Sequence, residues 1–166
     1  MRRVAAPATV AAFVDRYGAL FEHSRWVAEN AWEKRPFADR EDLLAKLEQA
    51  MYEAPRERQL ELIRAHPDLA GRAAIEGTLT PDSRREQASA GLDRLTPDEY
   101  EQFTRANTAY RERFGFPFVI CAREHDKASI LAAAEARLQR GPDEERRAAL
   151  DEIAKIARLR FEDLPR

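Results

Sequence analysis

Cysteine is nearly absent from this 166-residue chain, because Cys121 is the only one, and so no internal disulfide can form. Its three histidines lie far apart, and no Cys/His spacing suggests a zinc site. Basic and acidic residues nearly balance, at 28 and 30, and no basic tract stands out. These absences argue against a disulfide-stapled secreted domain, a zinc-binding module and a nucleic-acid-binding protein.

Long hydrophobic runs are missing as well. No stretch approaches the about 20 apolar residues of a membrane span. The basic start at Arg2 and Arg3 is not followed by the apolar core of a secretory signal. The last residues, 163–166, do not end in a peroxisomal tripeptide. We therefore expect a cytoplasmic protein that binds neither membrane nor nucleic acid.

Helical periodicity fills most of the chain, with apolar residues at three- and four-residue steps behind residues that cap helices. We predict helices that open at Thr9, Ser24, Asp39, Pro55, Thr80, Thr96, Asp126 and Pro142. Glycines that are placed to end helices are Gly91, Gly115 and Gly141. Period-two alternation is absent, and only residues 118–122 could be briefly extended. The prediction is an all-α fold, with a short tail over residues 1–8 and a single compact multi-helix domain over residues 9–166.

The helix predicted from Pro81 to Ala90 has almost no apolar stripe. Its residues Ser83, Glu86 and Gln87 share one face at three- and four-residue spacing. In one interpretation this is a solvated surface helix. In the other, the polar face turns into a pocket, where a hydroxyl, a carboxyl and an amide lie side by side.

The helical pattern breaks at the block His66–Gly71. A histidine at a helix C-terminus sits among carbonyls that favour its protonated form. Pro67 ends the preceding helix and fixes the chain direction after it. Such a histidine is a cap or a core group in one interpretation and a catalyst in the other.

Two further features each have a purely structural interpretation and a functional one. The block Phe114–Cys121 has three phenylalanines around Gly115 and Pro117 and cannot form an amphipathic helix. It is either a buried connection or an apolar pocket wall whose backbone N–H groups receive an anionic ligand. Arg160 projects from the apolar stripe of the last predicted helix, so it either reaches out to water or meets a carboxylate from the protein or a substrate.

Together these segments resemble the OHCU decarboxylase family. The resemblance rests on the blocks His66–Gly71, Ser83–Leu92, Phe114–Phe118 and Ile153–Phe161, in that order and with fitting spacing. It covers nearly the whole chain, from about Phe13 to Leu164.

The resemblance implies an all-helical homodimeric enzyme without a metal or organic cofactor. Its substrate would be 2-oxo-4-hydroxy-4-carboxy-5-ureidoimidazoline, which it would decarboxylate to (S)-allantoin in urate breakdown. The catalytic residues that the resemblance implies are His66 and Glu86. The substrate-binding residues that it implies are Pro67, Ser83, Gln87, Phe118, Val119 and Arg160, the pair 118–119 acting through backbone N–H groups. Arg158 lies close enough to Arg160 to be the alternative guanidinium.

This chemistry suits the residue types. Loss of carbon dioxide leaves an electron pair that the adjacent ring C=N bond can accept, so no pyridoxal or thiamine sink is required. Two alternatives stay open at this point. One is a non-enzymatic helical interaction module, and the other is a hydrolase or isomerase that acts on a related ureido compound.

Overall fold

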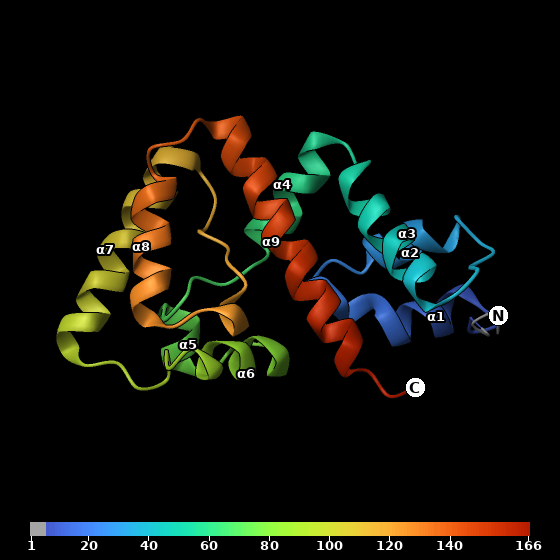
Figure 1. Ribbon diagram of the computed structural model, residues 1–166, viewed down its shortest axis with the longest axis horizontal. Helices are drawn as coiled ribbons and strands as arrows, with labels where there is room; N and C mark the ends of the chain where they lie inside the picture. The colour runs from blue at the N-terminus through green and yellow to red at the C-terminus, as the bar shows by residue number, and fades with distance from the viewer. Residues whose placement is uncertain (1–5) are drawn as a thin grey trace. The chain divides into compact units, whose positions relative to one another are not determined.

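A computed structural model describes residues 6–166, and all regular structure in that range is helical (Figure 1). The α-helices are α1 Val10–Tyr17, α2 Trp26–Trp32, α3 Arg40–Tyr52, α4 Arg56–Arg64, α5 Arg72–Glu76, α6 Pro81–Ser89, α7 Pro97–Phe114, α8 Lys127–Arg137 and α9 Pro142–Asp163. Two 3₁₀ turns are η1 Gly18–Leu20 and η2 Ala122–Glu124. The all-α prediction is confirmed for these residues, and none of their helices is both long and apolar enough to cross a membrane. Of the predicted tail, residues 1–5 lie outside the described range.

Helix starts follow the predicted caps closely. Five capping side chains each accept a hydrogen bond from the backbone N–H three residues further on, and they are Thr9, Asp39, Thr80, Thr96 and Asp126. Such an acceptor replaces the carbonyl that the first turn of a helix lacks. After α6 and α7 the glycines at 91 and 115 have φ of 81° and 76°, a left-handed conformation without a Cβ penalty.

Some predicted boundaries are wrong. Ser24 does not cap α2, because Arg25 occupies the cap position and Ser24 provides only its backbone carbonyl to Val27. α8 ends at Arg137 and not near Gly141, since the chain tightens there into i→i−3 bonds. The five-residue α5 was not predicted; none of its residues is buried, so it carries no apolar stripe.

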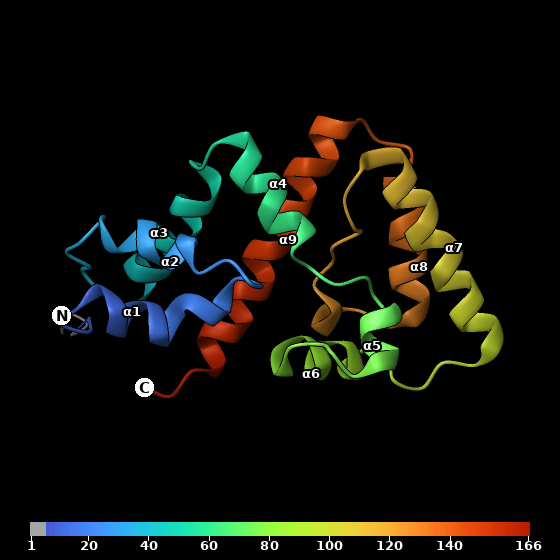
Figure 2. The same cartoon turned by 180° about the vertical axis from the view of Figure 1, so that it is seen from behind.

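The described residues divide into two compact units, residues 6–65 with 154–166 and residues 66–153. In the first unit α1 packs on α2 and α2 on α3, as Figure 2 shows from behind. The ring of Phe13 lies at its centre, with centroids 5.3 Å from Trp32 and 5.5 Å from Phe37. That residues 9–166 form a single domain stays a prediction.

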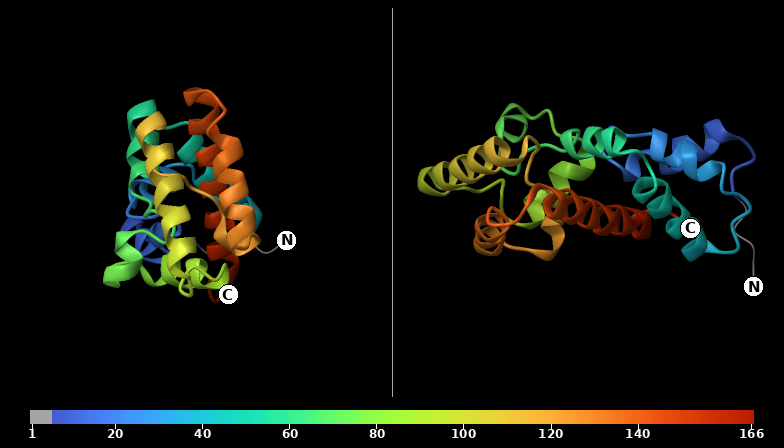
Figure 3. Two further views of the ribbon diagram at one scale, coloured as in Figure 1. Left: turned by 90° about the vertical axis from the view of Figure 1, so that its left-hand side faces the viewer. Right: turned by 90° about the horizontal axis from the view of Figure 1, so that it is seen from above.

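In the second unit α7 and α8 lie side by side (Figure 3), and α6 packs against η2. Its core includes the buried side chains of Phe103, Tyr110, Phe118, Ile130, Leu150 and Ile153. This unit contains every predicted site residue except Arg160, which belongs to the first unit.

Candidate functional site

The polar helix α6 turns its predicted face inward. Ser83 and Gln87 are each only 5 % exposed and Glu86 is half-buried, whereas Arg84 and Arg85 on the opposite face are exposed. A solvated surface helix would expose both faces alike. The burial therefore favours the interpretation in which a hydroxyl, a carboxyl and an amide face the interior.

Gln87 joins α6 to the turn that carries the histidine. The backbone N–H of Ala70 donates to Gln87 Oε1 at 2.9 Å, and Gln87 Nε2 donates to the carbonyl of Asp68 at 3.3 Å. We call residues 66–71 the histidine turn. His66, at its start, is buried, with 7 % of its surface exposed. The two bonds hold the inward face of α6 against this turn.

The histidine turn has a shape that only certain residues tolerate. A Cβ on Gly71 would lie 2.7 Å from the Cβ of Asp68, so any larger residue must displace the chain. Ala70 has φ of 53°, a left-handed conformation that costs an L-residue roughly 1–2 kcal/mol. Asn107 of α7 donates to the carbonyl of Leu69 at 2.9 Å. Strained backbone of this kind persists only where its surroundings hold it, and it clusters at functional sites.

We call residues 114–121 the aromatic segment. Phe118 and Val119 are buried there, and the carbonyl of Val119 accepts a hydrogen bond from Arg137 Nη1 at 2.7 Å. Within residues 6–166, the backbone N–H groups of Phe118 and Val119 make no hydrogen bond to the protein. Because buried backbone donors are nearly always paired, these two are suited to receive oxygen atoms of a ligand.

The charge of the Glu86 carboxyl contributes to the pKa of Cys121, which lies at the C-terminal end of the aromatic segment. Burial raises the pKa of the Cys121 thiol to about 11, and the negative charges of Glu124, Glu152 and Glu86 add to the rise. Cys121 therefore stays protonated near neutral pH and is not an activated nucleophile. Because α6 is bonded to the histidine turn and packs against η2, which directly follows the aromatic segment, these three segments are neighbours within the second unit.

Arg160 is buried in the first unit, with 5 % of its surface exposed. Its Nη2 lies 3.2 Å from Glu22 Oε2, and its Nη1 donates to the carbonyl of Ala19 at 3.2 Å. The prediction that a buried Arg160 needs a carboxylate is confirmed, and the partner is Glu22. Sequence reasoning missed Glu22 because it lies in the irregular turn after η1, where no periodicity marks it. Arg158, the alternative guanidinium, is half-exposed and faces Glu41 at 3.2 Å.

Among the described residues, no group of three or more His, Cys, Asp or Glu side chains is arranged to hold a metal ion. The roles of the predicted site residues toward a substrate stay predictions. Within the second unit, Gln87 joins the histidine turn to the α6 face that also bears Ser83 and Glu86, and α6 packs against η2, which directly follows the aromatic segment.

Comparison with known proteins indicates one family for this chain. The family model described as OHCU decarboxylase matches residues 7–162. A Haloferax volcanii protein named 2-oxo-4-hydroxy-4-carboxy-5-ureidoimidazoline decarboxylase is 47 % identical over 149 residues, which cover 90 % of this chain and 86 % of its own length.

Two solved structures resemble the fold. The crystal structure of (S)-allantoin synthase aligns with a TM-score of 0.73 and 30 % identity, over 93 % of this chain and 50 % of that one. This chain therefore spans half the length of that protein. The crystal structure of OHCU decarboxylase in the presence of (S)-allantoin aligns with a TM-score of 0.67 and 24 % identity, over 82 % of this chain and 87 % of that one. The second likeness confirms the predicted fold type.

Proposed function

The chain belongs to the OHCU decarboxylase family, and we propose the roles that its own residues play in the reaction of that family. The enzyme is a carboxy-lyase of urate breakdown, and it converts 2-oxo-4-hydroxy-4-carboxy-5-ureidoimidazoline into (S)-allantoin and carbon dioxide. The pair of hydrogen bonds between Gln87 and the histidine turn carries the assignment of residues. It brings the face of α6 that bears Glu86 to the segment that bears His66.

The reaction needs one bond cleavage and one proton delivery. The bond between ring carbon 4 and the carboxylate breaks, and its electron pair forms a double bond to carbon 5. The electron pair of the adjacent C=N bond moves to the ring nitrogen, which takes up a proton. The enol at carbon 4 then loses its hydroxyl proton and becomes a carbonyl, the ring nitrogen keeps its proton, and carbon 5 gains a proton. The face that receives this last proton decides the handedness of allantoin.

We assign His66 to the 4-hydroxyl and carboxylate region of the substrate as the main acid–base group. Glu86 controls proton delivery to the ureido-bearing carbon. Acid–base assistance of this kind is typically worth about 10²–10⁴-fold in rate. The half-burial of Glu86 supports this role, because the carboxyl keeps contact both with the interior and with water that can restore its proton.

Substrate oxygens are bound by directed donors. The amide oxygen and nitrogen of Gln87 each hold one bond to the histidine turn and keep one further hydrogen-bonding position. The N–H groups of Phe118 and Val119 bind carboxylate or ring oxygens, and Arg160 binds a ureido or ring carbonyl. Ser83 adds a hydroxyl, and Pro67 shapes the wall beside the imidazole. Donors that bind these oxygens equally in the ground state and in the transition state lower KM without changing kcat.

The decisive experiment replaces His66 by asparagine and follows the transient substrate made by urate oxidase and its hydrolase partner. Circular dichroism reports (S)-allantoin directly. We expect the enzymatic rate to fall by about 10²–10⁴-fold. The matched control is His125→Asn, because the His125 ring contacts Ser129 of α8, with Nδ1 3.0 Å from Ser129 Oγ, and no role in the reaction is assigned to it. Fast, stereospecific decay with His66→Asn would remove His66 from the mechanism.

The variant Glu86→Gln distinguishes an effect on the rate of carbon dioxide release from an effect on the handedness of allantoin. With proton delivery lost, we expect the product to be largely racemic even where carbon dioxide is still released. The exposed Glu124→Gln, also near Cys121, is the control and should give only the (S) product. Undiminished optical purity with Glu86→Gln would assign the proton delivery to another group.

The assembly and location are part of the same proposal and rest on the resemblance to the family. We propose a homodimer, for which sedimentation equilibrium would give twice the 19.0 kDa of one chain. We also propose a cytoplasmic enzyme, which cell fractionation would find with cytoplasmic markers.

A further inference from the structure

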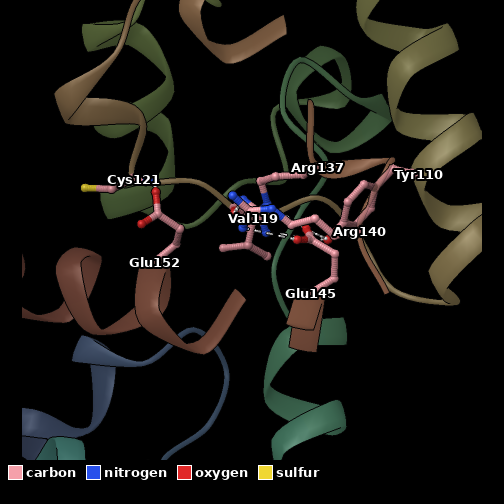
Figure 4. A network of polar contacts seen from close by, with 7 residues as sticks. All are labelled: Tyr110, Val119, Cys121, Arg137, Arg140, Glu145 and Glu152. Carbon is pink, nitrogen blue, oxygen red and sulfur yellow. Dashed lines mark hydrogen bonds and ion pairs between the residues drawn. The ribbon is translucent and has the colours of Figure 1, made fainter. Parts of the chain in front are cut away.

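A buried ion pair lies next to the aromatic segment. Arg137 of α8 places Nε 2.6 Å from Glu145 Oε1 of α9, with side chains 8 % and 0 % exposed. The hydroxyl of Tyr110 on α7 donates to the same carboxylate oxygen at 2.6 Å. Arg140 Nη1 lies 3.8 Å from the other oxygen. Figure 4 shows Tyr110, Arg137, Arg140 and Glu145 gathered beside Val119 of the aromatic segment.

Arg137 also holds two consecutive residues of the aromatic segment. Its Nη1 donates to the carbonyl of Val119 at 2.7 Å, and its guanidinium carbon lies 4.5 Å from the ring centroid of Phe118. The ring of Tyr110 meets the same Phe118 ring edge-on at 5.2 Å. The peptide group that carries the Val119 N–H therefore lies between two anchored points, the Phe118 side chain and the Val119 carbonyl.

Stability alone does not explain this arrangement. Removing two charges from water costs several kcal/mol, and apolar residues of similar volume often replace such a pair with no loss of stability. Arg137 divides its donors between Glu145 and the backbone of Val119. A planar guanidinium with donors at fixed angles suits this task, because the position of one partner dictates the position of the other. The ion pair therefore ties the position of the peptide group between Phe118 and Val119 to the positions of α7, α8 and α9.

We propose that Arg137, fixed by Glu145 and Tyr110, is a positioning residue that aims the N–H groups of Phe118 and Val119 at substrate oxygens. It touches no reacting atom and acts only through the backbone of the aromatic segment. This inference rests on the proposed function, in which those two N–H groups bind the substrate.

The test removes all three polar groups while it keeps the core filled, in the variant Tyr110→Phe/Arg137→Met/Glu145→Leu. If the N–H groups contact the substrate equally in ground state and transition state, KM rises while kcat holds. We expect KM and the Kd of (S)-allantoin each to rise at least about tenfold, with kcat within about threefold of wild type. The matched control is Glu101→Leu/Arg105→Met on α7, an ion pair of 3.1 Å with side chains 65 % and 72 % exposed. The control should keep the wild-type KM and Kd.

A folded triple variant with wild-type KM and wild-type allantoin affinity would overturn the positioning role. If the triple variant does not fold, Arg137→Lys gives the same information. Lysine keeps the charge opposite Glu145 but lacks the planar fork and the stacking surface, so KM should again rise. A folded Arg137→Lys protein with unchanged KM also overturns the inference. A wild-type protein that fails to accelerate formation of (S)-allantoin would refute the proposed function itself, which is a separate outcome.

Discussion

Replacing Glu22 by glutamine perturbs the way in which Arg160 is held inside the first unit. The side chain of Arg160 is 4 % exposed and that of Glu22 is 3 % exposed, and Arg160 Nη2 lies 3.2 Å from Glu22 Oε2. Glutamine keeps the volume of the side chain and can still accept a hydrogen bond, but it removes the negative charge. Breaking one partner of a buried pair costs about 3–5 kcal/mol, so we expect about 3 kcal/mol, the lower end, for this mild change.

Urea denaturation followed by circular dichroism measures the loss. With a slope of about 2 kcal/mol per molar urea, a loss of about 3 kcal/mol lowers the unfolding midpoint by about 1.5 M. The control is Glu41→Gln, because Glu41 pairs with Arg158 of the same helix at the same 3.2 Å but with side chains 73 % and 43 % exposed. Exposed pairs contribute little, so its midpoint should move by less than about 0.5 M. Equal shifts in the two variants would refute the reasoning that burial decides the strength of this pair.

Three further predictions concern the rest of the molecule. Thr96→Ala should lower the free energy of unfolding by about 1 kcal/mol, because the Glu99 N–H loses its capping acceptor. The control Thr104→Ala, at an exposed position of the same helix, should leave that free energy unchanged. Equal losses of unfolding free energy for the two variants in urea denaturation would contradict this. Iodoacetamide at pH 8 should alkylate Cys121 at least about 100-fold more slowly in the native protein than in the urea-unfolded chain, because the folded pKa of about 11 exceeds the ordinary 9.0 and leaves far less thiolate. The alkylation rate of the native protein should rise with pH up to that pKa. Equal rates for the native and unfolded chains at pH 8 would show an accessible thiolate. Dialysis against EDTA should leave kcat/KM unchanged, and a loss that added metal restores would contradict the absence of a cofactor.

Local features of the chain could be predicted from the sequence because their physics is local. The capping box of Thr96 and Glu99 forms between residues three apart, and Gly115 ends α7 at the position that requires positive φ. The grouping of Ser83, Glu86 and Gln87 on one face of α6 follows from spacing along one helix, whereas only the structure shows that this face is turned inward. The blocks around His66 and the aromatic segment could be recognised as a family pattern, and with them the fold and the reaction.

Tertiary structure alone decided which partners these residues have. Glu22 pairs with Arg160 although 138 positions separate them, and Gln87 binds the histidine turn across 17 and 19 positions. No periodicity marks Arg137, Glu145 and Tyr110 as one network, because each sits on a different helix. Pairing of this kind depends on how far burial strips water from each group, and burial is a property of the packed chain. Helix formation is decided within a few residues, whereas the strength of a buried charge is decided by everything packed around it.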